Sequence, residues 1–262
     1  MARRRRRCEG STTEASEAAH DAGARASRLA CAPQPITATR PPYWGRTVTV
    51  GGPFYSEPIL TARETARYLG MPESTLDVWL VDRGKEPLVH GLEPEKRGWP
   101  RVPFVGVIEA YVLRALRDLK LPMEEIRGAA ELVREEFDDP YALAHRRIVT
   151  DGVALFVKAA DESYVHARDR QLAIPEILRE HLKNIEWNAE GNAKRLHLRN
   201  FPEAADVIID PRFGWGSPVL GESKVKVEDL VALWRQGERF TTIADEYDLT
   251  VDVVEDVLRR AA

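Results

Sequence analysis

The sequence predicts a mainly α protein with small β elements (α+β), in which two helix-turn-helix units flank a middle segment. Three observations predict this class. Helical periodicity with clear start and stop signals fills the region up to residue 140, short strand patterns follow, and three short helical patterns come after residue 203. The hydrophobic share of 44% and the charged share of 31% suit a globular chain. No apolar run approaches the ~18 residues of a membrane span, so we expect a cytoplasmic protein without a membrane partner.

The first 53 residues are predicted to be a low-complexity or extended tail. They contain the run Arg3–Arg7, both cysteines (Cys8 and Cys31) and one short strand pattern, Thr47–Val50. A disulfide in a segment with so few large apolar side chains would stabilise no core. The arginine run is interpreted as a solvated tail, with nucleic-acid binding as the alternative.

Residues 54–140 form the first predicted domain, and it begins with a helix-turn-helix. Thr61 and Glu64 have capping-box spacing, Leu60 precedes them as an apolar staple, and Gly70 ends the helix. A second helix follows Pro72. The predicted inward faces are Ala62, Thr65, Ala66 and Leu69 in the first helix and Leu76, Trp79 and Leu80 in the second.

Residues 83–103 are rich in Gly, Pro and charge, and can hold two short strands with a loop, the usual size of a wing. Two helices are then predicted within residues 105–137, split at Leu121-Pro122. Their predicted core faces are Ile108, Tyr111, Val112, Ala115, Leu116 and Leu119, and then Ile126, Ala129, Ala130, Val133 and Phe137.

The middle segment, 141–202, changes period. ALFVKA and SYVHAR are strand candidates, residues 174–185 are predicted to be helical, and IEWN and AKRLHLRN flank AEGN as a hairpin. The predicted inward face of the helix consists of Ile174, Ile177, Leu178, His181, Leu182 and Ile185.

The last domain, 203–262, has strand residues interrupted by Pro and Gly, then three short helices that include a second helix-turn-helix. The apolar positions that mark these helices are Val227, Leu230, Val231 and Trp234, then Ile243, Ala244 and Tyr247, and finally Val251, Val254, Val257 and Leu258.

Two stretches carry resemblances to known families. LTARETARYLGMPESTLDVW, with the wing segment and the helix pair up to residue 130, resembles the winged-helix N-terminus of MerR-like regulators, whose E-E-I-R motif is here Glu124–Arg127. The stretch from Ile209 onward is similar to a small domain first catalogued as a domain of unknown function and associated with VapB-type antitoxins. Its matching positions are Ile209, Asp210, Pro211, Gly216, Pro218, Val219, Gly221, Val225, Val227, Gly237, Ile243, Ala244 and Tyr247, while Glu222–Lys224 and Trp215 depart from the pattern.

These resemblances imply an antitoxin of a type II toxin-antitoxin system that neutralises a PIN-domain ribonuclease of the VapC type and represses its own operon as a homodimer bound to operator DNA. A stand-alone MerR-like transcription factor is the alternative, and a structural dimer with degenerate DNA-binding units is a third possibility. The genes beside this one separate the first two, because an antitoxin should lie next to a short PIN-nuclease gene.

The second helix of the first unit is unusual for a DNA-reading helix because it has no Lys or Arg. Glu73 is explained by the helix dipole, but Asp77 occupies the place where the resembled regulators commonly have a phosphate-binding Arg. Phosphate contacts are therefore expected from flanking groups. The candidates are Arg63, Arg67, Ser74, Thr75, Arg83, Lys85, Lys96, Arg97 and Arg101, with a solvated basic loop as the alternative for the basic ones.

The C-terminal domain is expected to bind the toxin. Its net charge is −6, against −2 for residues 41–200 and +4 for residues 1–40, which suits a basic partner. The candidate contacts are Phe213, Trp215, Phe240, Asp252, Glu255 and Asp256, of which the aromatic residues are expected to be exposed.

No enzymatic chemistry, metal or cofactor is predicted. The six histidines (His20, His90, His145, His166, His181 and His197) lack metal-ligand spacing, and no Gly-rich phosphate loop, Cys pair or Ser/His arrangement occurs. The pair Asp138-Asp139 before Pro140 is interpreted as a turn.

Overall fold

The structure is a computed structural model that describes residues 57–81, 86–118, 120–152, 154–155 and 168–261, with the backbone alone for 168–174. The described residues belong to one compact unit. The tail with Thr47–Val50, most of both strand candidates, Leu119, Arg83 and Lys85 lie outside the described residues. Ala154 and Leu155, at the start of the first strand candidate, are helical, and Arg168, at the end of the second, opens a helix, so these parts of the prediction are wrong.

The N-terminal part contains β1 (Pro58–Leu60), α2 (Ala62–Leu69) and α3 (Glu73–Leu80). The predicted capping box of α2 is present: the Glu64 amide donates to Thr61 Oγ1 at 3.1 Å, and the Thr61 amide donates to Glu64 Oε2 at 2.9 Å. Gly70 ends α2 with a left-handed φ of 63°, a conformation that glycine adopts without steric cost. All seven predicted inward positions of the two helices are buried.

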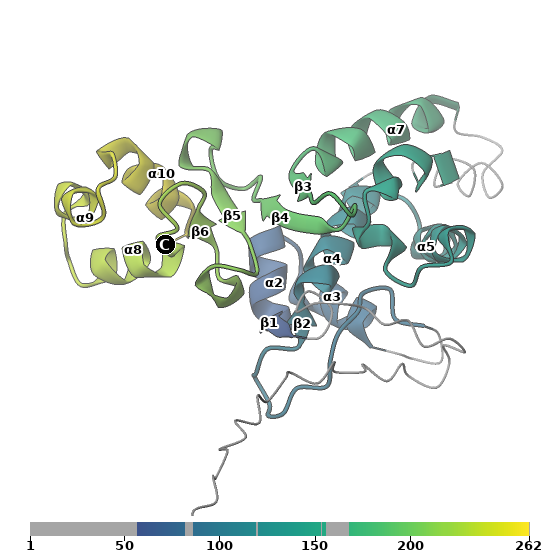
Figure 1. Ribbon diagram of the computed structural model, residues 1–262, viewed down its shortest axis with the longest axis horizontal. Coiled ribbons are helices and arrows are strands. Elements are labelled where there is room, and N and C mark those ends of the chain that lie inside the picture. Colours follow the sequence, from purple (N-terminus) through teal and green to yellow (C-terminus); the bar gives the residue numbers. More distant parts are fainter. Residues whose placement is uncertain (1–56, 82–85, 119, 153, 156–167, 262) are drawn as a thin grey trace, which may run out of the picture. The chain divides into compact units, whose positions relative to one another are not determined.

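Helices α4 (Phe104–Asp118) and α5 (Met123–Phe137) are separated at Leu121-Pro122, as predicted. Every predicted core position that the structure describes in this pair is buried. The α4 helix is buried on almost every side from Phe104 to Leu113, which is expected of a helix that is apolar around its circumference. It packs against α5, α7 and the single turn η1 (Ala142–Ala144), and lies centrally among them (Figure 1).

The predicted pair of wing strands is not found in the described residues 86–101, which form an irregular loop. The strand β2 (Val102–Pro103) follows this loop and pairs antiparallel with β1. In the sequence, β1 precedes the helix-turn-helix and β2 comes after it. Proline explains the difference, because it has no amide proton to donate to a ladder, and Pro87, Pro94 and Pro100 recur through the segment.

The middle segment contains a π-helical turn, η2 (Ile148–Gly152), and the helix α7 (Arg168–Leu182), which begins before the predicted start at Ile174. Leu178 and Leu182 are buried as predicted. Ile177 is 37% exposed and Ile185 lies in the next strand, so both were wrongly placed on the inward face of the helix.

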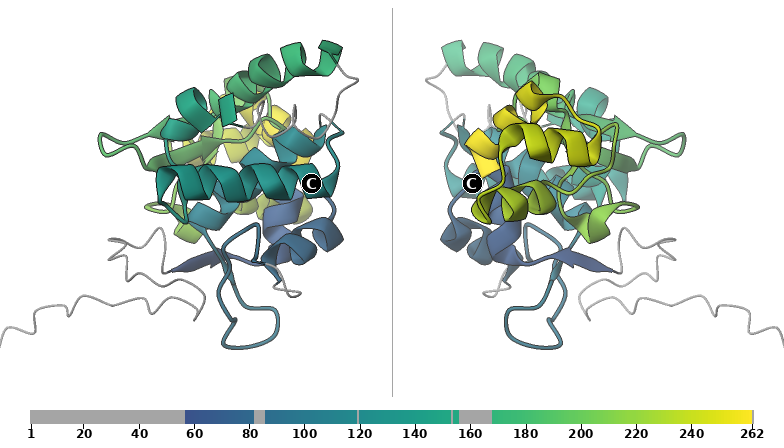
Figure 2. Two further views of the ribbon diagram at one scale, coloured as in Figure 1. Left: turned by 90° about the vertical axis from the view of Figure 1, so that its right-hand side faces the viewer. Right: turned by 90° about the vertical axis from the view of Figure 1, so that its left-hand side faces the viewer.

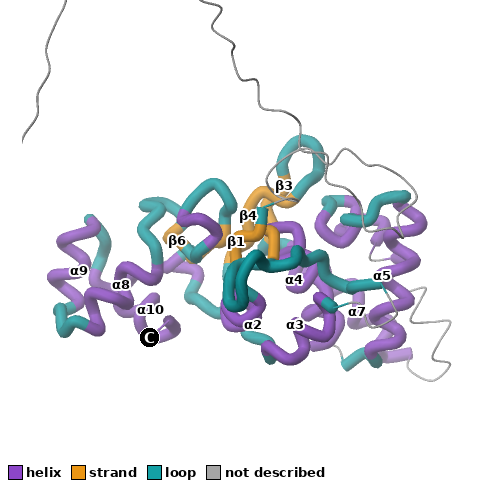
Figure 3. The backbone as a smooth tube through the Cα atoms, turned by 90° about the horizontal axis from the view of Figure 1, so that it is seen from below, coloured by secondary structure: helices purple, strands orange, loops and turns teal. Residues whose placement is uncertain are grey.

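A four-stranded antiparallel sheet follows, in the order β3 (Ile185–Trp187), β4 (Ala193–His197), β5 (Val207–Ile209), β6 (Val219–Leu220). The predicted hairpin is its β3–β4 pair. Figure 3 shows how short these strands are beside the helices. The predicted boundary between the middle segment and the last domain lies after residue 202. Because β4 pairs with β5, the sheet contains residues from both sides of this boundary.

Three helices complete the chain: α8 (Val227–Arg235), α9 (Phe240–Tyr247) and α10 (Val251–Ala261). They pack against one another through the predicted apolar faces (Figure 2, yellow-green and yellow), and Asp248 makes the left-handed turn between α9 and α10 with a φ of 52°. Trp234 and Val251 are exceptions, because both are exposed.

Candidate nucleic-acid and protein interfaces

The candidate nucleic-acid face is the outer side of α2 and α3. Packing of Leu76 and Trp79 into the core turns Ser74 outward, whereas Thr75 and Asp77 are half-buried. The outer side of α3 therefore presents the Ser74 hydroxyl, the carboxylates of Glu73 and Asp77, and no cation. Phosphate contacts from flanking groups stay a prediction.

The two arginines of α2 are exposed but differ in their partners. Arg63 Nε lies 4.0 Å from Glu73 Oε2, a weak surface ion pair. Arg67 donates to the Tyr68 hydroxyl at 2.7 Å, with its guanidinium over the ring, and the Tyr68 hydroxyl donates to Glu228 of α8 at 3.1 Å. Arg67 is therefore engaged beside an acidic helix, whereas Arg63 has no strong partner among the described residues.

The loop between α3 and β2 carries the remaining described candidates. Lys96 and Arg97 are exposed, whereas Arg101 is half-buried and its backbone amide donates to the Leu60 carbonyl at 2.9 Å. The structure adds Trp99, which is 47% exposed with Lys96 Nζ 5.0 Å from its ring centre. The sequence alone could have indicated that Trp99 is exposed. It lies between Gly and Pro in a basic loop, where it belongs to no helix or strand that could bury it.

A buried charge network holds the base of this loop. Glu109 of α4 is fully buried; it accepts the backbone amide of His90 at 2.7 Å, and its Oε1 lies 2.7 Å from His90 Nδ1 and 3.2 Å from Arg134 Nη2. Arg134, on α5, also donates to the carbonyls of Leu88 at 2.7 Å and Pro87 at 3.1 Å. Two helices are thereby tied to the start of the loop.

The pKa of Glu109 reflects this network. Burial by itself would raise the pKa, but the charge and hydrogen bonds of His90 and the charge of Arg134 outweigh burial, and the net shift is downward. Our sequence reasoning missed the network, although a glutamate within the apolar run of α4 is a signal, since buried carboxylates are almost always paired.

The candidate toxin-binding face centres on Trp215. Its side chain is 88% exposed, and its φ of 56° is left-handed, between Gly214 at 63° and Gly216 at 87°. A non-glycine residue in this region costs about 1–2 kcal/mol, so the loop holds an exposed aromatic ring at the expense of stability.

The other five candidates of this face are less prominent. Phe213 and Phe240 are half-buried, so the expectation that they are exposed is wrong: Phe240 packs against the core, and the Phe213 ring lies beneath the cations of Arg212 and Lys224 at 5.5 and 5.2 Å. Asp252 is exposed. Glu255 accepts from Arg259 at 2.5 Å and is half-buried, as is Asp256.

The sequence analysis predicted neither a metal site nor a membrane-spanning segment. Among the described residues no cluster of His, Cys, Asp and Glu could hold a metal ion. Within the same part of the chain, no helix is both long and apolar enough to cross a membrane.

Family models match two separate regions of the chain, and one relative matches most of it. A family model described as "Putative DNA-binding HTH domain" matches residues 58–130, and one described as "Protein of unknown function (DUF433)" matches residues 207–259. The chain is 30% identical over 226 residues to "Putative antitoxin VapB45" of Mycobacterium tuberculosis, covering 78% of this chain and 94% of the relative.

A solved structure agrees with this relationship. The crystal structure of Rv2018 from M. tuberculosis superposes with a TM-score of 0.68 at 31% identity, over 78% of this chain and 99% of that one. The alignments thus span nearly the whole of the sequence relative and nearly the whole of the crystallised chain. The chain therefore belongs to the family of the VapB45 antitoxin, with a domain of a DNA-binding helix-turn-helix family at its N-terminal end.

Proposed function

We propose that the protein binds and neutralises a PIN-domain ribonuclease of the VapC type and represses its own operon as a homodimer. The relative's name supports an antitoxin function, and the net charge of −6 on residues 201–262 supports a basic partner. The observation that carries the toxin-binding half is Trp215, because its aromatic ring is exposed to solvent and its backbone has an unfavourable left-handed conformation, a combination often found at binding surfaces.

On this proposal, Trp215 is the apolar anchor of the toxin interface and Asp252 is a rim charge. Tryptophan is enriched among residues that dominate binding energy, whereas rim charges mainly set the association rate. The proposal requires a gene for a PIN-domain ribonuclease beside this one, and titration of that ribonuclease with the full chain tests the proposal. A deletion of residues 203–262 would be a poor test, because it would remove two strands of the sheet and leave the edge of β4 unpaired.

The DNA-binding half of the proposal places the contacts at the first turn of α3 and in the elements beside it. The described candidates that carry it are Ser74 and Thr75 at the start of α3, Arg63 on α2, and Lys96 and Arg97 in the loop. Arg67 is exposed but engaged with Tyr68, and Arg101 is half-buried. Asp77 opposes phosphate binding from the same face. This arrangement predicts weak binding that depends on few phosphate contacts.

Asp77→Arg is therefore expected to strengthen binding to the upstream region of the gene, because it replaces a repulsive carboxylate by a guanidinium. Each new phosphate contact should steepen the slope of log affinity against log salt by about 0.9. Fluorescence anisotropy at several salt concentrations measures both quantities.

Asp252→Arg is the matched control, since it makes the same change in net charge on α10. It should leave the salt slope unchanged. A wild-type slope near zero, or equal gains from both variants, would contradict DNA binding through the first helix-turn-helix.

A further inference from the structure

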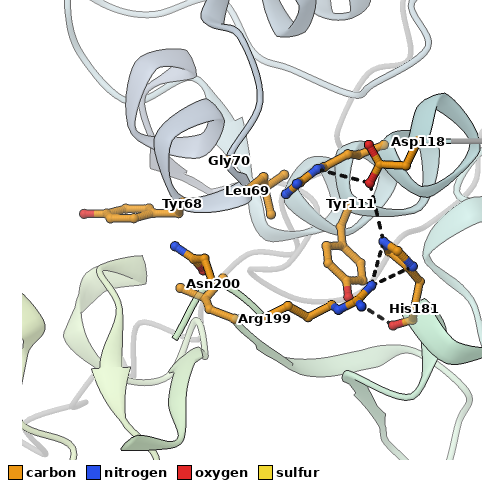
Figure 4. A pocket seen from close by; sticks show the side chains of 10 residues that line it. Tyr68, Leu69, Gly70, Tyr111, Asp118, His181, Arg199 and Asn200 are labelled. Atoms are coloured by element: carbon orange, nitrogen blue, oxygen red, sulfur yellow. Dashed lines mark hydrogen bonds and ion pairs between the residues drawn. The ribbon is translucent and has the colours of Figure 1, made fainter. Parts of the chain in front are cut away.

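A cavity of about 330 Å³ lies at the end of α2 and is unassigned by the proposed function. Its walls come from α2, α4, α7 and residues 198–200 after β4, as Figure 4 shows. Small-molecule sites commonly have volumes of roughly 300–1,000 Å³ and are lined by several elements. The cavity is therefore large enough for a small ligand.

Two guanidinium groups line this cavity, against one carboxylate. Arg114 is paired with that carboxylate, because its Nε lies 3.7 Å from Asp118 Oδ2. Arg199 belongs to no ion pair within the described residues. The neighbouring Glu180 is exposed and already accepts a hydrogen bond from Lys183 Nζ at 2.6 Å. The cavity thus has an excess positive charge.

Neutral groups hold Arg199 in place. Its Nη1 lies 2.8 and 2.9 Å from the two ring nitrogens of His181. A neutral imidazole has one unprotonated nitrogen, so one of these two contacts is a hydrogen bond donated by Arg199. Burial, followed by the charge of Arg199, lowers the pKa of His181, in agreement with a neutral ring. The hydroxyl of Tyr111 donates to the His181 carbonyl at 3.1 Å, and burial raises the pKa of Tyr111 to about 12.

Gly70 gives the second guanidinium room to reach the cavity. A Cβ atom at this position would lie 3.2 Å from Arg114 Nη1, closer than ordinary van der Waals contact. The glycine that ends α2 therefore also leaves space for Arg114 beside the turn of the helix-turn-helix. Leu69 and Leu198 supply apolar surface to the wall of the cavity.

We propose that this cavity binds a small ligand carrying a phosphate or carboxylate group, with Arg199 as the main contact and Arg114 as the second. A guanidinium offers a planar fork of donors that fits either oxyanion with two parallel hydrogen bonds. Arg199 is exposed to solvent at the mouth of the cavity, so an anion can reach it. Leu69 and Leu198 would cover the apolar part of the ligand.

Isothermal titration calorimetry of the full chain tests this site, with inorganic phosphate and succinate as separate probes. The two probes distinguish a phosphate site from a carboxylate site. Arg199→Gln is expected to weaken binding of whichever probe binds by about 10- to 100-fold, because it removes a charge-assisted hydrogen bond. Arg259→Gln, which removes an exposed cation on α10, should leave the affinity unchanged.

Saturable binding of one probe that is lost in Arg199→Gln but kept in Arg259→Gln would support the site. Absence of binding for both probes, or equal affinity in the wild type and Arg199→Gln, would overturn it. The titrations contain neither DNA nor ribonuclease, so their result is independent of the proposed antitoxin activity.

Discussion

Arg134→Met lowers the free energy of unfolding by about 3–5 kcal/mol, the expected cost of removing one partner from a buried ion pair. The substitution keeps most of the apolar stem but leaves Glu109, which is fully buried, without its guanidinium partner. It also deprives the carbonyls of Pro87 and Leu88 of their donor. Urea denaturation followed by circular dichroism measures the change.

The matched control is Arg127→Met on the same helix. Arg127 donates to the Glu86 carbonyl in an exposed setting, so its replacement should change stability by no more than about 0.5 kcal/mol. Equal effects of the two variants would contradict the account of a buried network that holds the loop.

Acid should weaken the same network. The pKa of Glu109 is lower in the folded chain than its ordinary value, so its contribution to stability is complete above about pH 4.3 and is lost as the pH falls through the folded-state pKa.

Trp215→Gly is expected to change stability and toxin binding in opposite directions. Glycine adopts the left-handed φ of this position without the steric cost, so the free energy of unfolding should rise by roughly 0.5–1 kcal/mol after the extra chain entropy of glycine is allowed for. Loss of the anchoring ring should weaken the complex with the ribonuclease by at least about 2 kcal/mol, or roughly 30-fold.

Trp234→Ala serves as the control for Trp215→Gly. Trp234 is also exposed, at 40%, but lies on α8 in an ordinary helical conformation. It should leave the affinity for the ribonuclease close to that of the wild type. Surface plasmon resonance with full chains measures binding, and equal affinity of wild type and Trp215→Gly would remove Trp215 from the interface.

Local signals were sufficient for much of the fold. The capping box at Thr61 and Glu64, the stop at Gly70 and the break at Leu121-Pro122 each fix a helix end through hydrogen bonds or dihedral angles within a few residues. The hairpin was also predictable, because its two strands lie close together in the sequence.

What the sequence did not reveal depends on contacts between distant residues. The partner of β2 is β1, about 40 residues earlier in the chain, and no periodicity encodes that pairing. The burial of Glu109 depends on His90 and Arg134, and the cavity brings Arg114 and Arg199 together from separate elements. Trp215 could be proposed as an exposed residue from the sequence, but its left-handed backbone conformation could not be predicted.

The central claim is that the chain silences a ribonuclease, and the most direct measurement is a titration of that activity. The PIN-domain ribonuclease that the proposal requires beside this gene is purified and mixed with increasing amounts of the full-length chain, and cleavage of a fluorogenic RNA is followed. We expect activity to fall to baseline at a fixed molar ratio, with Trp215→Gly requiring a much higher concentration. Undiminished cleavage at a large excess of the wild-type chain would contradict the claim.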